Sequence, residues 1–249
     1  MQELFGLNAA SSLVAHTEFD GDPAVAQLSR AIGFEVDGVR HAIFLAVSTR
    51  AVEGGVLATC HACGATLSYA VFRTSQNIVA RQKASQSAIY GAPSGWDLVA
   101  LERHAADLGV FGEIPLEKSE QSDPVALHPA MPPHLILLVE TGYTGQGQTS
   151  VGQNVFLIDL SAGRNQQSYK GHVWTAGQDC SLLAVNDDDG TPKGDREPDF
   201  KGELRVDASV FPPVFRVEER YFKNCQETPS GHPPVLKTYR LMGDEYRAD

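Results

Sequence analysis

The sequence predicts a mainly β protein, an antiparallel sandwich or barrel-like fold with one N-terminal helix. Short segments rich in β-branched and aromatic residues recur along the chain, and Gly, Asn, Ser and Pro separate them. The alternation of strands and helices that marks a doubly wound fold is missing. Apolar residues make up 42% of the 249 residues and charged residues 20%, which is typical of a globular protein with a sizeable core.

The one expected helix covers residues 22–32. Asp22 suits the N-cap position, and Pro23 suits the first helical position, where no backbone N–H is needed. Apolar residues follow at helical spacing and would lie on one face: Val25, Leu28 and Ile32. This segment is therefore interpreted as an amphipathic helix.

The remaining periodic segments have the length and composition of β-strands. In the first half they cover residues 40–51, 67–75 and 96–103. In the second half they cover residues 134–143, 154–161, 168–177, 180–187, 201–210, 214–222 and 236–247. Segment 214–222 alternates most clearly, with Phe215, Val217 and Tyr221 expected on one face of a sheet.

A polar, proline-containing stretch divides the sequence near its middle. Residues 117–133 are expected to form a linker or a long crossing between an N-terminal half, 1–116, and a C-terminal half, 134–249. The two halves also fit one continuous domain.

The formal net charge of −11 limits the classes of partner. Nucleic acid and anionic membranes attract basic surfaces, and no basic stripe is visible, so we expect no nucleic-acid partner. No apolar run approaches the roughly 18–20 residues that span a bilayer. A basic protein is the partner that this charge favours. The first 21 residues lack the features of a signal peptide, so the chain is either cytosolic or an exported protein that begins at Met1 in place of its signal.

The four cysteines bear on that choice of compartment. Cys60 and Cys63 flank the short stretch His61-Ala62, and Cys180 and Cys225 lie far apart in the second half. An even number of cysteines in an acidic β-rich chain favours disulfides, and hence a periplasmic or extracellular protein. Four cysteines allow three connectivities. The most economical pairs Cys60 with Cys63 and Cys180 with Cys225.

Two other functions are open to the Cys60/Cys63 turn. A thiol redox couple lies where a strand meets a helix N-terminus, but the residues that follow Cys63 have the composition of a strand. A zinc site usually has two short-spaced ligand pairs, and no second Cys-x-x-Cys exists. The histidines that could complete a zinc site are His41, His104, His172 and His232, and their spacing selects none of them. We expect no metal and no cofactor.

The acidic stretch 186–199 is one candidate partner-binding site. Asp187, Asp188 and Asp189 are consecutive, whereas calcium-binding loops place their carboxylates at alternate positions. The spacing favours a solvated acidic turn over a calcium site. These three aspartates are expected to meet a basic partner.

The glycine-rich stretch 141–154 is the second candidate. It lies between two expected strands and lacks the lysine of a phosphate-binding loop, which disfavours a nucleotide site. A polar hairpin tip that carries Tyr143 is the expected structure. Because exposed loops often carry recognition residues, Tyr143 is a candidate contact to a partner.

Several segments together resemble a group of exported bacterial proteins of unassigned activity. They are "AIFLAVSTR", "CHACGATLSYAVF", "WDLVALER", "LGVFGE" and "GYTGQGQT", between about residues 38 and 160. Small acidic periplasmic proteins of this kind include immunity partners of antibacterial effectors, such as the lipases that type VI secretion delivers. The resemblance implies a disulfide-containing, periplasmic binding protein.

We therefore expect a binding protein that acts by surface complementarity and has no catalytic residues. The nearest approach to a nucleophile motif, "GAPSGW" at 91–96, places Ser94 between glycines but departs from Gly-x-Ser-x-Gly. The alternatives are a periplasmic hydrolase or a thiol oxidoreductase that uses Cys60 and Cys63. A structural protein of the cell envelope is a third.

Overall fold

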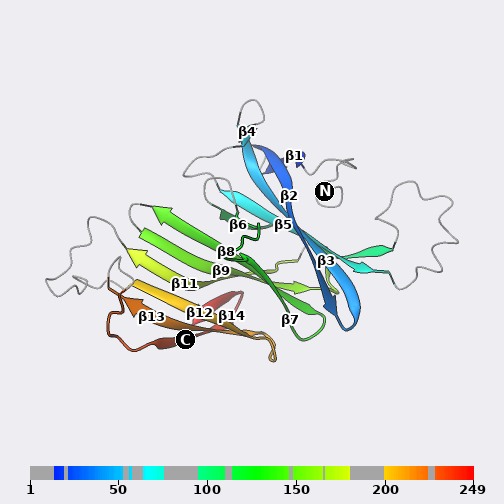
Figure 1. Cartoon of the computed structure of the whole chain (residues 1–249). Coiled ribbons are helices and arrows are strands. Elements are labelled where there is room, and N and C mark those ends of the chain that lie inside the picture. The colour runs from blue at the N-terminus through cyan, green and yellow to red at the C-terminus, as the bar shows by residue number, and fades with distance from the viewer. Residues whose placement is uncertain are drawn as a thin grey trace, which may run out of the picture. The chain divides into compact units, whose positions relative to one another are not determined.

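The computed structural model describes residues 14–19, 22–52, 56–57, 64–75, 95–109, 114–145, 148–164, 166–179, 199–223 and 228–249. The regular secondary structure within these ranges consists of β-strands, which form two sheets (Figure 1). The predicted mainly β, antiparallel fold class is therefore confirmed. The described residues include no helix with the length and apolar character that crossing a lipid bilayer requires.

The chain forms two compact units, and each takes in segments from both halves of the sequence. Unit 1 comprises Met1–Glu117, Pro132–Leu135 and Ile158–Ser168, and unit 2 comprises Lys118–Met131, Ile136–Leu157 and Tyr169–Asp249. The stretch 117–133, expected as a linker or crossing, contains a strand of unit 2, β7 (Val125–Pro129).

Unit 1 contains a seven-stranded sheet in the order β1-β2-β3-β5-β6-β10, with β4 paired to β3. Its strands are β1 (Val14–Phe19), β2 (Asp22–Val36), β3 (Val39–Val52), β4 (Val56–Leu57), β5 (Ala65–Thr74), β6 (Trp96–Gly109) and β10 (Gly163–Arg164). The pairs are antiparallel apart from β10, which runs parallel to β6. Strands β3, β5 and β6 contain the segments predicted at 40–51, 67–75 and 96–103.

The prediction of a helix at residues 22–32 is wrong, because Asp22–Val36 forms strand β2. This strand pairs with β1 on one side and β3 on the other, so its backbone hydrogen bonds go to neighbouring strands. A two-residue turn, Asp37-Gly38, joins β2 to β3, and both residues have positive φ values of 50° and 73°. An Asp-Gly pair is the preferred sequence for such a hairpin turn.

The sheet of unit 1 buries both of its faces around β3 and β5. Large side chains that are fully buried on one face come from registered pairs, Ile43 with Val71 and Leu45 with Tyr69. The opposite face packs the buried side chains of Ala46, Ala70 and Leu101 against Phe72 and Leu98. Burial on both faces explains why these strands read as nearly continuous apolar runs.

A buried carboxylate also joins separate segments of unit 1. Glu102 on β6 is 7% exposed, and its Oε2 accepts hydrogen bonds from Tyr69 Oη at 2.8 Å and Ser168 Oγ at 2.5 Å. The backbone N–H of Ser168 donates to the same carboxylate, at 3.2 Å from Oε2. Burial, and then the negative charge of Glu102, raise the pKa of Tyr69 well above its usual range.

Unit 2 contains an eight-stranded sheet in the order β15-β14-β13-β12-β11-β9-β8-β7. Besides β7, its strands are β8 (His134–Gly145), β9 (Gln148–Asp159), β11 (Tyr169–Asp179), β12 (Asp199–Asp207), β13 (Val214–Phe222), β14 (Val235–Met242) and β15 (Glu245–Ala248). The first two residues of β8 and the last two of β9 count with unit 1. The segments predicted at 134–143, 168–177 and 214–222 lie in or overlap β8, β11 and β13, whereas 180–187 lies outside the described residues.

One face of this sheet holds the core of unit 2. Its buried members are Ala130, Ile136, Leu138, Val155, Leu157, Val173, Phe215, Val217, Tyr239 and Tyr246. The sheet curls, because β15 approaches β11 as well as pairing with β14: a Cβ on Gly171 would lie 3.7 Å from Glu245 Cβ. We call the side that holds the core the inner face.

The opposite, outer face of β12 and β13 is charged. Side chains of both signs lie across the two strands, as in the pair of Arg205 Nη2 and Glu218 Oε2 at 3.5 Å. Arg220 also reaches Glu218, at 3.9 Å, and Arg205 is 64% exposed. The exposure of these side chains identifies this face as a solvated surface. Ion pairs on such a surface contribute little to stability.

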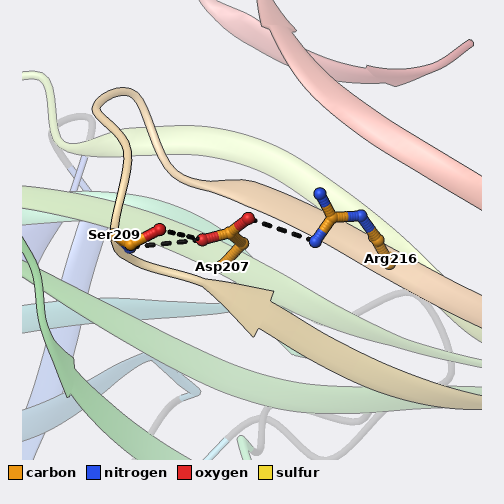
Figure 2. A network of polar contacts seen from close by, with 3 residues as sticks. All are labelled: Asp207, Ser209 and Arg216. Atoms are coloured by element: carbon orange, nitrogen blue, oxygen red, sulfur yellow. Dashed lines mark hydrogen bonds and ion pairs between the residues drawn. The ribbon is translucent and has the colours of Figure 1, made fainter.

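Asp207 at the end of β12 fastens the turn that leads into β13 (Figure 2). Its Oδ1 accepts from Ser209 Oγ at 2.6 Å and from the Ser209 backbone N–H at 3.3 Å, and its Oδ2 accepts from Arg216 Nη1 at 3.2 Å. The Ser209 hydroxyl, followed by Arg216, holds the pKa of Asp207 below its usual value.

Candidate functional site

A pocket of about 360 Å³ opens on the inner face of β12, β13 and β14 in unit 2. We call it the Glu219 pocket. Its lining residues are Phe200, Glu219, Tyr221, His232, Pro233, Val235 and Lys237.

Strand register places these side chains on the side of the sheet that also holds the core. Successive side chains of a strand alternate between the two faces. Phe215 and Val217 are fully buried in the core, so Glu219 and Tyr221, the next two positions of the same parity on β13, continue that row. The apolar row therefore becomes polar near the end of the strand.

The neighbouring strands supply the rest of the lining. On β12, Phe200 pairs with Tyr221 and Gly202 pairs with Glu219. On β14, Val235 pairs with Glu219, and Lys237 pairs with Val217 one step further along. These residues come from three separate parts of the sequence and meet only because the register is correct.

Gly202 is required where β12 passes Glu219. A Cβ at this position would clash with Val217 Cγ1 and would lie 3.2 Å from the backbone oxygen of Thr175 on β11. A side chain here would push the strands apart, so glycine allows the close approach of β11, β12 and β13 beside the pocket.

Glu219 supplies a buried carboxylate to the pocket. The residue is 1% exposed, and its Oε2 accepts a hydrogen bond from Tyr221 Oη at 2.8 Å. Lys237 Nζ lies 3.0 Å from Oε1 and forms an ion pair with it. Apart from this ion pair, Oε1 accepts no hydrogen bond. A carboxylate oxygen has capacity for two donors, and burial normally goes with at least one.

Aromatic rings surround this carboxylate. Lys237 Nζ lies 5.6 Å from the centre of the Phe200 ring, which places the ammonium group over an aromatic face. The rings of Tyr221 and His232 meet edge to face with centres 6.4 Å apart. Val235, which is 42% exposed, and Pro233 complete an apolar lining.

This arrangement is suited to binding. The charges of Glu219 and Lys237 are opposite and adjacent, so the polar part of the pocket carries little net charge. Of the described lining residues, none is Ser, Thr or Cys, the side chains that most often serve as hydroxyl or thiol nucleophiles. Concave sites with mostly apolar linings and a few convergent polar groups are the usual form of ligand sites.

A smaller pocket of about 230 Å³ shares Phe200 with the Glu219 pocket. Its other lining residues are Thr149, Val151, Ala176, Gly177, Gln178, Asp199, Lys201 and Phe222. The ring of Phe200 lies so close to β11 that a Cβ on Gly177 would be 2.8 Å from its Cε1 atom. The backbone of β11 therefore holds this ring in place from one side.

The residues singled out in the sequence do not form this site. Tyr143 lies on β8, 48% exposed as predicted, and does not line the Glu219 pocket. Asp187, Asp188 and Asp189 lie outside the described residues. The same holds for the four cysteines, Cys60, Cys63, Cys180 and Cys225, so their pairing stays a prediction.

The histidines considered for zinc have separate surroundings. His41 on β3 is buried and stacks on Phe34 with ring centres 5.2 Å apart, and His172 on β11 meets Trp174 edge to face at 4.2 Å. His104 lies on β6 and His232 lines the Glu219 pocket. In the described ranges no three His, Cys, Asp or Glu side chains gather as metal ligands would.

Sequence reasoning missed Glu219 although a signal was present. The alternation in "VFRVEERYF" had assigned Phe215, Val217 and Tyr221 to the buried face, and Glu219 has the same parity. A carboxylate in a buried row needs a partner or a function. The partner, Lys237, was not identifiable because the offset between β13 and β14 is not encoded locally.

Comparison with known proteins adds no relative to this picture. No family model, no curated protein and no solved structure matches the chain.

Proposed function

We propose that the chain is an exported binding protein that acts by surface complementarity. The partner is a protein, and the class that fits the sequence is an immunity protein that neutralises a secreted antibacterial effector such as a lipase. Its place of action on this proposal is the periplasm or the outside of the cell.

The observation that carries the proposal is the Glu219 pocket. Protein interfaces draw most of their energy from a few side chains that enter well-packed pockets. A lining of aromatic and aliphatic groups around one buried acceptor supplies such a socket on unit 2. The solvated charges on the opposite face of β12 and β13 keep that face polar, which leaves the inner side for recognition.

Net charge supports a basic partner. At −11, the chain attracts a basic protein over a distance, and salt screens that attraction beyond about 8–10 Å at physiological ionic strength. The consecutive Asp187, Asp188 and Asp189 add to the field, and Tyr143 offers an exposed aromatic contact.

Binding kinetics against the product of a neighbouring gene test the proposal. We expect saturable binding whose association rate falls as salt is raised. Val235→Trp would fill the mouth of the Glu219 pocket and speed dissociation, whereas Glu218→Gln on the other face of β13 would change neither rate. The triple change of Asp187, Asp188 and Asp189 to Asn would slow association alone.

Thiol chemistry tests export separately. Protein prepared under oxidising conditions and then unfolded should show no reactive thiols until a reductant is added. Four reactive thiols without reductant would contradict an exported, disulfide-bonded protein. If no protein partner binds, a hydrolase or a thiol oxidoreductase using Cys60 and Cys63 becomes the better explanation.

A further inference from the structure

We infer that the Glu219 pocket binds a planar aromatic group that carries a neutral hydrogen-bond donor at its edge, the indole of Trp or the phenol of Tyr. The inference rests on the proposed function in one respect: the natural source of the group is a side chain of the protein partner.

Glu219 supplies a hydrogen-bond acceptor whose capacity is not filled. Glu219 is 1% exposed and lines the pocket, and its Oε1 has no hydrogen-bond donor although Oε2 is bonded to Tyr221. Buried polar atoms in folded proteins almost always have hydrogen-bond partners. A ligand that enters the pocket and donates one hydrogen bond to Oε1 completes the set.

The charge of Lys237 limits which donors can approach Oε1. Lys237 Nζ lies 3.0 Å from the same oxygen. A cationic donor that approaches Oε1 would come close to this ammonium group and be repelled, and an anion would be repelled by Glu219 itself. A neutral N–H or O–H group meets neither penalty.

The walls of the pocket favour a flat ligand. The walls are the rings of Phe200, Tyr221 and His232 with the aliphatic side chains of Pro233 and Val235. Aromatic rings favour offset or edge-to-face contacts with other rings, so these walls favour a flat aromatic ligand. The volume of about 360 Å³ is large enough for one indole or phenol ring system.

Size, charge and acceptor together select the class. Trp and Tyr combine a large apolar body with one polar edge, and both are enriched among the side chains that dominate protein interfaces. A phenylalanine side chain would fill the walls but leave Oε1 without a donor. A lysine or arginine side chain would supply donors but would bring its charge next to Lys237.

Small-molecule probes test the inference without any partner. The full chain, labelled with ¹⁵N, is titrated with indole and with 1-methylindole, which has the same ring but no N–H donor. We expect indole to shift resonances from β12, β13 and β14 saturably, and 1-methylindole to bind about tenfold more weakly because its complex leaves the acceptor unsatisfied. The pair p-cresol and 4-methylanisole repeats the comparison for the phenol.

Three variants locate the effect. Val235→Trp occupies the mouth from a position that is 42% exposed, so it leaves the fold intact and should abolish indole binding. Glu219→Leu should make indole and 1-methylindole bind equally. Glu218→Gln, on the neighbouring residue of the same strand but the other face, is the matched control and should bind indole as the wild type does.

Three outcomes would overturn the inference. Equal affinity of the wild type for indole and 1-methylindole would remove the role of Glu219, and tighter binding of tryptamine than of indole would show a cation site. No binding up to the solubility limit would remove the site altogether. The two proposals fail separately. If indole binds in the donor-dependent way but no protein partner binds in the kinetic experiment, the proposed function is wrong and the chemistry of the pocket stands. If a protein partner binds but indole does not, the pocket inference is wrong and the proposed function stands.

Discussion

Glu102 in unit 1 and Glu219 in unit 2 are both buried glutamates on β-strands, at 7% and 1% exposure, yet their surroundings differ. Glu102 accepts hydrogen bonds from Tyr69 and from both the hydroxyl and the backbone N–H of Ser168. Glu219, which lines a pocket, accepts one hydrogen bond, from Tyr221, and its other oxygen forms an ion pair with Lys237.

The difference separates a structural carboxylate from a candidate binding carboxylate. The donors of Glu102 come from β5 and from the segment before β11, so its hydrogen bonds join parts of the chain that are distant in sequence. Glu219, in contrast, has one hydrogen bond and one ion pair, and its Oε1 accepts no hydrogen bond. Satisfied networks stabilise and fix a core, whereas an unused buried acceptor marks a place where a ligand can contribute.

The largest effect is expected from Glu102→Leu. The substitution leaves the buried Tyr69 hydroxyl and the Ser168 donors without an acceptor, and we expect it to lower the free energy of unfolding by about 3 kcal/mol. Urea titration measures the loss. Glu203→Leu, at a side chain that is 63% exposed, is the control and should change stability little. If the Glu102→Leu variant were as stable as the wild type, Glu102 would not be a structural carboxylate, and its contrast with Glu219 would be lost.

Tyr69→Phe probes the same network through its pH dependence. Because burial raises the folded-state pKa of Tyr69 above the ordinary value of 10.0, its stabilising contribution is fully present below pH 10 and is lost as the pH rises beyond it. At pH 7 the free energy of unfolding of the variant should be about 1.5 kcal/mol lower than that of the wild type. Above pH 10 this difference in unfolding free energy should become smaller.

Urea titrations at pH 7, 9 and 11 measure this gap. Burial raises the pKa of Tyr246 as well, so part of the alkaline loss should persist in the Tyr69→Phe variant. Tyr143→Phe, at an exposed position, is the control. A constant gap across the three pH values would contradict the assignment to Tyr69.

Glu219→Leu should change stability much less than the same substitution at Glu102. Lys237 is 33% exposed and can be solvated when its partner is removed, and Tyr221 lines the pocket. We expect a change in the free energy of unfolding within about 1 kcal/mol. A loss equal to that of Glu102→Leu in the same urea titration would make Glu219 a structural residue too.

The smallest effect is expected at the carboxylate of Asp207, whose side chain is 27% exposed. Ser209→Ala removes the hydroxyl that donates to Oδ1, so the pKa of Asp207 should rise toward its ordinary value of 3.8. The lowered pKa contributes stability that is present above pH 3.8 and is lost as the pH falls through the folded-state value, and the variant narrows that window. Carbon-13 NMR titration of the carboxyl group measures the rise, with Ser29→Ala as the control.

The local sequence pattern was sufficient to locate most of the strands. Segment 214–222 coincides with β13, and its assignment of Phe215 and Val217 to the buried face is confirmed. Segment 134–143 begins where β8 begins. Alternating apolar residues and β-branched runs act over a few residues, so they can be read without knowledge of the partner strands.

The helix predicted at 22–32 failed because local signals were ambiguous. Apolar spacing and an Asp-Pro start favoured a helix, but burial in β2 follows a period of two from Ala31 to Val36. The Asp37-Gly38 turn then pairs β2 with β3. Pairing on both sides supplies more hydrogen bonds and burial than an isolated helix gains from propensity alone.

The sequence by itself determined that this is an acidic β protein, where most of its strands lie, and which face of β13 is buried. Only the tertiary structure decided that Glu102 has several hydrogen-bond donors, whereas Oε1 of Glu219, in a residue that lines a pocket, is ion-paired with Lys237 and accepts no hydrogen bond. The physical reason is range: alternation is set by neighbouring residues, but the partners of a buried carboxylate come from strands whose register is fixed by the whole sheet.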